Sequence, residues 1–256
     1  PDSSWERNTA EEFLNWALIQ QGDYAQASAR LVPALQRARD CGDQQMSIDL
    51  SAMLAVVELV NGNLEEAQVT LDRATEGWSP DRYLFSHVWL FYAEAPLALM
   101  NGKIDVALKL CRETVKAMGP ASLNQLAFIR DSVKEIEART YLLATLAGDR
   151  AKAGLAKKRA RELRRTKNPV LGAHADVIDA GLAIAAHETD AAIEAWRRAE
   201  AVFAEYGMEA HHAAIEIQVA RLSADEASAE APGYFQRAKI RDPRALANLL
   251  VPAFAP

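Results

Sequence analysis

Hydrophobic residues recur at helical spacing along most of the chain, with polar residues in the positions between them. Alternating runs rich in Val, Ile and Thr and bounded by turn pairs, which would indicate strands, are missing. Good helix formers, namely alanine, leucine, glutamate and arginine, abound. The pattern therefore predicts an all-α protein.

The predicted helices come in pairs, and each pair is separated by one punctuating residue at a spacing of about 40 residues. These residues are Gly22, Gly62, Gly102, Gly148 and, in a fifth unit, His187. The first helices are predicted at 9–21, 44–61, 80–101, 122–147 and 170–186, and their partners at 24–40, 64–77, 104–118, 150–166 and 190–206. Another helix is predicted from Met208 to Ser223, and Thr9 with Glu12 predicts a capping box.

Small residues recur at two fixed offsets after each punctuating residue. Five positions on stand Ala27, Ala67, Ala107, Ala153 and Ala192, and twelve positions on stand Ala34, Ala74, Thr114, Ala160 and Ala199. Residues seven apart share one helical face, where small side chains let a neighbouring helix approach closely. The two offsets predict tight helical hairpins.

These offsets resemble the tetratricopeptide repeat, whose second helix carries alanines at the same distances from the turn glycine. The clearest copies begin at Gly22, Gly62 and Gly102, although the units are longer than the family's usual length of about 34 residues. The resemblance implies a right-handed superhelical stack of about five hairpins over residues 1–223. Residues 224–256 are predicted as a linker and short helices that cap the stack within the same domain.

No catalytic or phosphate-binding motif is present, so we predict neither an enzyme nor a cofactor. His211, His212 and Glu216 are the best metal candidate, because His212 and Glu216 lie one helical turn apart. Two ligands do not make a site, and a polar helix surface is the preferred interpretation. No metal is predicted.

The remaining compositional signals concern location. Cys41 and Cys111 lie far apart, without the spacing of a disulfide framework or a zinc site, which fits a reducing cytoplasm. No stretch approaches about 18 uncharged apolar residues, so no membrane association is predicted. Because Pro1 cannot be a translation start, we interpret the chain as a fragment of a longer protein.

The first candidate binding surface is the concave groove that the resemblance implies. In the family, positions thirteen and ten before the turn residue commonly face the ligand. Carried over, these positions give as candidate partner contacts Glu12, Asp49, Trp89, Tyr92, Glu135 and His174. The aromatic residues gathered between Trp78 and Tyr92 are better explained as core than as anchors, with Trp89 and Tyr92 the best exceptions.

The second candidate surface is basic. Residues 150–167 hold nine cations against Glu162 alone, so this segment contributes +8 while the rest of the chain carries −14. The basic patch comprises Lys157, Lys158, Arg161, Arg164 and Arg165. Such a patch can attract nucleic acid or an acidic protein segment, and a solvated helix face is an equally good interpretation.

The leading functional hypothesis is a non-catalytic protein-interaction or regulatory module of a larger bacterial signalling protein. Residues 238–254 resemble the end of large bacterial regulators that join a Ser/Thr kinase or a STAND-type ATPase to a repeat sensor. The partner would be a protein or peptide, including other domains of the same parent chain. Two alternatives stay open: nucleic-acid or polyanion contact through residues 150–167 of a transcriptional regulator, and a small-molecule effector site between the third and fourth hairpins.

Overall fold

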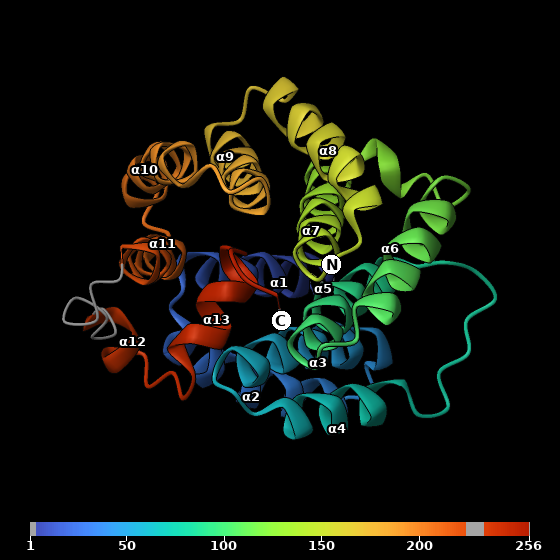
Figure 1. Cartoon of the computed structure of the whole chain (residues 1–256). Helices are drawn as coiled ribbons and strands as arrows, with labels where there is room; N and C mark the ends of the chain where they lie inside the picture. The colour runs from blue at the N-terminus through green and yellow to red at the C-terminus, as the bar shows by residue number, and fades with distance from the viewer. Residues whose placement is uncertain (1–3, 224–232, 256) are drawn as a thin grey trace.

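The computed structural model describes residues 4–223 and 233–255 of the chain. It folds them into thirteen α-helices and two short 3-10 turns, and these described residues contain no β-strand (Figure 1). The all-α prediction is confirmed.

Ten of the helices form the five predicted hairpins. They are α1 (Ser4–Gln21) with α2 (Tyr24–Asp40), α3 (Gln44–Val60) with α4 (Leu64–Thr75), α5 (Phe85–Met100) with α6 (Ile104–Met118), α7 (Ala127–Leu146) with α8 (Ala153–Arg165), and α9 (Pro169–Ala185) with α10 (Thr189–Glu205). The further helix predicted at 208–223 is α11 (Glu209–Leu222).

Three predicted helix starts are wrong. Helix α1 begins at Ser4, so Thr9 lies inside it and the predicted capping box does not exist. Helices α5 and α7 begin five residues later than predicted, at Phe85 and Ala127. Pro80 and Pro120 lie in irregular segments before these helices. A proline disfavours helical backbone at the residue before it, and here the helix does not begin directly at the proline either.

The punctuating residues all adopt the left-handed backbone conformation that ends a helix. Four of them are glycines with φ between 68° and 109°, and His187 has φ of 64°. The sequence pattern thus located the hairpin turns, including the one that lacks glycine.

The alanine pattern marks the helix contacts in four of the five units, where the alanine at the first offset is fully buried. The fourth unit differs because a 3-10 turn, Arg150–Lys152, precedes α8. This turn shifts the helix, so Ala153 is half-buried and Ala156 takes the fully buried position.

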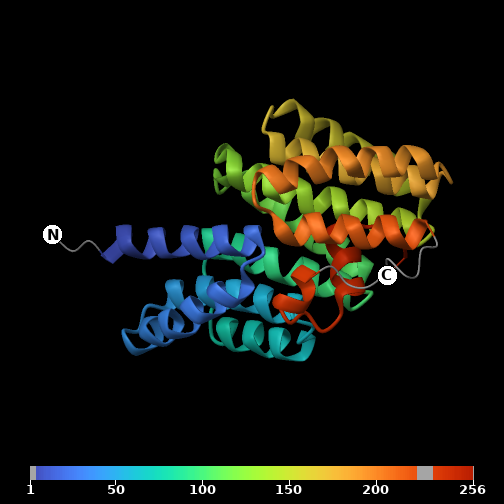
Figure 2. The same ribbon diagram turned by 90° about the vertical axis from the view of Figure 1, so that its left-hand side faces the viewer.

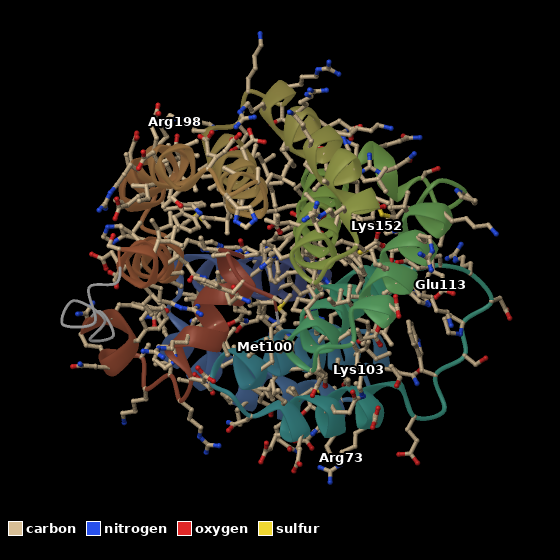
Figure 3. All side chains as sticks on the ribbon, in the orientation of Figure 1. Arg73, Met100, Lys103, Glu113, Lys152 and Arg198 are labelled. Atoms are coloured by element: carbon tan, nitrogen blue, oxygen red, sulfur yellow. The ribbon has the colours of Figure 1, made fainter. Side chains whose placement is uncertain are left out.

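The hairpins stack around a ring (Figure 1). Helices α1, α3, α5, α7, α9 and α11 lie on its inner side, and α2, α4, α6, α8 and α10 lie outside them. In the perpendicular view the helices lie side by side along a common direction (Figure 2). Charged side chains such as Arg73, Glu113 and Arg198 project from the outer side (Figure 3).

The two ends of the stack meet. Tyr234, in the short helix α12 (Gly233–Arg237), donates a hydrogen bond of 2.8 Å from its hydroxyl to the carbonyl of Gly22. A Cβ atom on Gly22 would lie 3.0 Å from the Cβ of Ala210, so the first hairpin turn also touches the start of α11. These contacts close the superhelix into a ring.

The C-terminal helices α12 and α13 (Pro243–Leu250) pack against α11. Helix α13 also contacts α5 and lies in the middle of the ring (Figure 1). The linker predicted at 224–232 lies outside the described residues. No helix in the described part of the chain combines the length and the apolar character that a bilayer span requires.

Candidate functional site

The inner helices and the C-terminal segment enclose a cavity of ≈ 560 Å³. Its wall is contributed mainly by the six inner helices and by α13, with Tyr24 of α2 and the residues Thr166 and Asn168 before α9. Most of the lining side chains are apolar, among them Ile19, Val60, Phe128, Leu171 and Leu250. Cavities that hold small molecules commonly measure about 300–1,000 Å³ and combine an apolar wall with few polar groups.

Helix α13 forms one wall because its sequence makes a short amphipathic helix. Asp242 caps it by accepting a hydrogen bond from the backbone of Ala245 at 2.9 Å, and Pro243 occupies the first turn, where its missing N–H is no loss. Leu246, Leu249 and Leu250 are buried, at the i, i+3 and i+4 positions of one face. The helix therefore presents a continuous apolar face to the ring.

Polar groups of the inner helices hold the backbone that follows this face. Arg139 Nη1 donates to the carbonyl of Leu249 at 3.2 Å, and Gln218 Nε2 donates to the carbonyl of Val251 at 2.7 Å. Gly181 in α9 allows the C-terminal backbone to approach this helix closely, since a Cβ atom at Gly181 would lie 2.8 Å from the carbonyl oxygen of Pro252. The guanidinium carbon of Arg221 lies 3.7 Å from the centre of the Phe254 ring.

A cluster of ionisable side chains lies at the cavity wall. Arg139 Nη2 donates to Glu135 Oε2 at 2.9 Å, and His174 Nδ1 lies 3.6 Å from Glu135 Oε1. His211 packs edge-on against His174, with the ring centres 5.1 Å apart. Burial lowers the pKa of both histidines. The charge of Glu135 partly offsets this for His174, whereas His174 and Arg139 lower the pKa of His211 further, so the neutral form of both rings is favoured.

Two buried residues at this wall keep a polar atom that has no hydrogen-bond partner among the described residues. They are Arg139 at Nε and His211 at Nδ1, and these residues are 8 and 7% exposed. The Tyr92 hydroxyl lies at the same wall, where burial raises its pKa and a hydrogen bond with Ser132 lowers it, so the hydroxyl stays protonated. Buried polar atoms normally find partners, and unsatisfied ones gathered at a cavity indicate a place for a ligand.

Aromatic rings line the same cavity. Trp16 stacks on Tyr92, with ring centres 5.0 Å apart and planes 17° apart. Trp89 packs against both rings and is 1% exposed, so it supports this wall from the core without lining the cavity. Phe128 lies at the mouth and is 42% exposed.

The structure divides the six candidate groove residues into two groups. Tyr92, Glu135 and His174 line the cavity. Trp89 lies behind the wall, and Glu12 and Asp49 are buried together where α1 packs on α3. Burial raises the pKa of both carboxyl groups well above their ordinary range, and the charge of Asp49 raises that of Glu12 further.

The basic patch belongs to α8, which lies on the outer side of the ring (Figure 1), and its residues are not among the described residues that line the cavity. Arg164 pairs with Asp176 at 2.7 Å and with Asp179 at 2.8 Å, so carboxylates of α9 neutralise it. The other members, Lys157, Lys158, Arg161 and Arg165, are exposed and have no ion pair among the described residues. The patch is thus a group of four cations open to solvent.

The histidines considered as metal ligands point to different places. His211 lies at the cavity, while His212 approaches Glu200 and Glu216, with the three candidate ligand atoms within 4.8 Å of one another. Glu200 already accepts a hydrogen bond of 2.6 Å from Arg197, and Glu216 is exposed. A charge-paired surface cluster accounts for this arrangement.

Sequence reasoning missed Arg139 and the role of α13 as a wall of the cavity. Arg139 lies between the apolar residues Ile136 and Leu143 in an inner helix, and a charge among such residues is the signal that could have singled it out. The placement of α13 inside the ring had no comparable signal, because it depends on the closure of the whole stack.

Comparison with known families agrees with the fold. Residues 18–77, from the end of α1 through α4, match the family model of the tetratricopeptide repeat. No curated protein and no solved structure matches the chain. The family match covers the first two hairpins, and the stacked hairpins of the rest of the chain fit the same tetratricopeptide-like helical arrangement. Tetratricopeptide repeats generally mediate contacts between proteins.

Proposed function

We propose that this chain is a non-catalytic interaction module of a regulatory protein, and that it binds a helical segment of a partner protein on the inner face of its ring. The observation that carries the proposal is α13 itself, an amphipathic helix already seated on this face. Helices bound in grooves are recognised through apolar anchors at i, i+3 and i+4, the spacing of Leu246, Leu249 and Leu250.

In this proposal α13 is a resident ligand that a partner helix replaces. Two side chains, Arg139 and Gln218, hold the backbone of the tail and would serve equally for a partner's backbone. The resident helix is tethered, so its effective concentration is high, on the order of millimolar. Replacement of α13 by a partner helix is therefore a step at which binding can be regulated. The resemblance of residues 238–254 to bacterial regulators supports a signalling role.

The test is a binding measurement with a fluorescent peptide spanning residues 242–255. A chain carrying Leu249→Glu in its own tail is expected to bind the peptide, because its resident helix is weakened. A peptide carrying the same substitution is the matched control and is expected not to bind. The proposal fails if the folded L249E chain, checked by circular dichroism, binds both peptides alike or neither.

A second candidate function, contact with a polyanion such as nucleic acid, rests on the four unpaired cations of α8. Charge reversal at Lys157, Arg161 and Arg165 is expected to lower the affinity for single-stranded DNA at least about tenfold and to flatten its salt dependence. The matched control reverses Lys103, Lys109 and Lys116 along α6, which changes the net charge equally. Equal losses in both variants would contradict a specific role for α8.

A further inference from the structure

We propose that the central cavity binds a small zwitterion with an apolar body, of the size and chemistry of an apolar α-amino acid. The paired side chains Glu135 and Arg139 would receive its ammonium and carboxylate groups. This site goes beyond the exchange of α13, and the two share Arg139, which also holds the backbone of Leu249.

The first argument is the unsatisfied hydrogen-bonding capacity at one place. Arg139 Nε is a donor that has no partner among the described residues, and Arg139 is 8% exposed at the cavity wall. Glu135 Oε1 lies 3.6 Å from His174 Nδ1, which is too long for a hydrogen bond, so this oxygen retains accepting capacity. Because Arg139 and Glu135 are themselves hydrogen-bonded, a free donor and a free acceptor lie close together.

The second argument is the charge balance of the wall. Asp131 is paired with Arg130 at 2.9 and 3.0 Å and with Lys134 at 3.5 Å, and Glu135 is paired with Arg139. Lys134 also lies 3.9 Å from Glu162, and burial lowers the pKa of His174 and His211, so each carboxylate of the wall is already balanced by a cation. An anion or a cation alone would bring an uncompensated charge into this site, whereas a zwitterion matches both members of the Glu135–Arg139 pair.

The third argument is the room available beside the head-group position. The cavity measures ≈ 560 Å³, and its remaining wall consists of aromatic and aliphatic side chains such as Trp16, Val60 and Leu171. An apolar amino-acid side chain is compatible with this wall, and its burial would add to the polar contacts. A ligand without an apolar body would leave much of the cavity unfilled.

The test is isothermal titration of the full chain at pH 7 with L-phenylalanine, L-leucine and two analogues that each keep one charge, phenylacetate and phenethylamine. One of the amino acids is expected to bind at a single site. The analogues are expected to bind at least about tenfold more weakly, because each leaves one member of the ion pair without a partner. No binding of either amino acid at millimolar concentration, or equal binding of an analogue, would overturn the proposal.

Two variants locate the site. Ala127→Trp places a large side chain at an exposed position of the cavity mouth and is expected to abolish binding. Ala191→Trp, at an exposed position of α10 away from the cavity, is the matched control and is expected to bind normally. Glu135→Gln preserves size and is expected to weaken amino-acid binding at least about tenfold. Unchanged binding by A127W and E135Q would place the ligand elsewhere and overturn the assignment.

Discussion

His187 adopts a backbone conformation that the other four hairpin turns give to glycine. A side chain in the left-handed region costs about 1 kcal/mol relative to glycine, and the neighbouring residues hold His187 in it nonetheless. The turn geometry is thus imposed by the packing of α9 on α10, and the choice of residue only adjusts its stability.

Replacing His187 by glycine is therefore expected to stabilise the fold by about 1 kcal/mol. The reverse test is Gly102→Ala, at φ of 68°, where the described residues place no atom within 4 Å of the added Cβ; it is expected to destabilise the fold by a similar amount. Urea denaturation measures both. Opposite signs for the two variants agree with this account, and a destabilised H187G variant would show that the imidazole makes a contact worth more than the strain.

The buried carboxyl pair Glu12 and Asp49 makes stability depend on pH. Burial raises the pKa of Glu12 to about 8 and that of Asp49 to about 7, so the folded chain keeps protons that the unfolded chain releases at lower pH. The pair therefore contributes stability at acid pH. This stability is lost as the pH rises from the ordinary carboxyl pKa through the raised values of about 7 and about 8.

Glu12→Gln removes one of these carboxyl groups. Its melting temperature, relative to that of the wild type, is expected to increase between pH 5 and pH 9, when measured by differential scanning calorimetry in steps of pH. Glu6→Gln, at an exposed position of the same helix, is the control and is expected to show a constant difference. A pH-independent difference for E12Q would contradict the shared burial of the pair.

At the scale of elements, the packing of α8 depends on the 3-10 turn before it. Ala156 is fully buried while Ala153 is half-buried, although the repeat pattern assigns the buried position to Ala153. Ala156→Leu is expected to destabilise by about 1–3 kcal/mol through overpacking, and Ala153→Leu by less than about 0.5 kcal/mol. Chemical denaturation measures the free energy of unfolding of both variants. Equal losses of stability would contradict the shifted register of α8.

The helices and their pairing could be predicted from the sequence because they depend on local signals. Turn residues with positive φ, apolar runs and spaced alanines act within one hairpin, and they located five hairpins correctly. The starts of α5 and α7 were missed because proline excludes helix before it without fixing where the next helix begins.

The candidate cavity was only partly predictable. Tyr92, Glu135 and His174 follow from the repeat offsets, which identify positions on the inner side of each first helix. Arg139 and His211 become part of one site only when α7, α9 and α11 curve around a common centre. That curvature is a property of the stack, and no single repeat encodes it.

At the scale of the whole molecule, closure of the ring depends on contacts between residues far apart in the sequence. The hydroxyl of Tyr234 reaches Gly22 across most of the chain and is buried there. Tyr234→Phe is expected to destabilise by about 0.5–1.5 kcal/mol in urea denaturation, the usual net value of a hydrogen bond. Tyr206→Phe, at an exposed tyrosine, is the control with no expected effect; equal changes in the two variants would contradict the closing bond.

Helix α13 occupies the inner face of the ring, and we propose that another helix can replace it. Spin labels attached at Arg244→Cys in α13 and Lys109→Cys in α6 measure the distance between these two helices by electron–electron double resonance. The exposed Cys41 is changed to serine, while the buried Cys111 is left in place, and Leu250→Ala weakens the resident helix enough for a peptide to compete.

We expect one narrow distance distribution for the labelled chain alone, because the ring holds α13 in a fixed position. Excess peptide of residues 242–255 is expected to convert it to longer and broader distances as the peptide takes the place of α13. A broad distribution without peptide, or a narrow one that persists when the peptide saturates the chain, would contradict the claim.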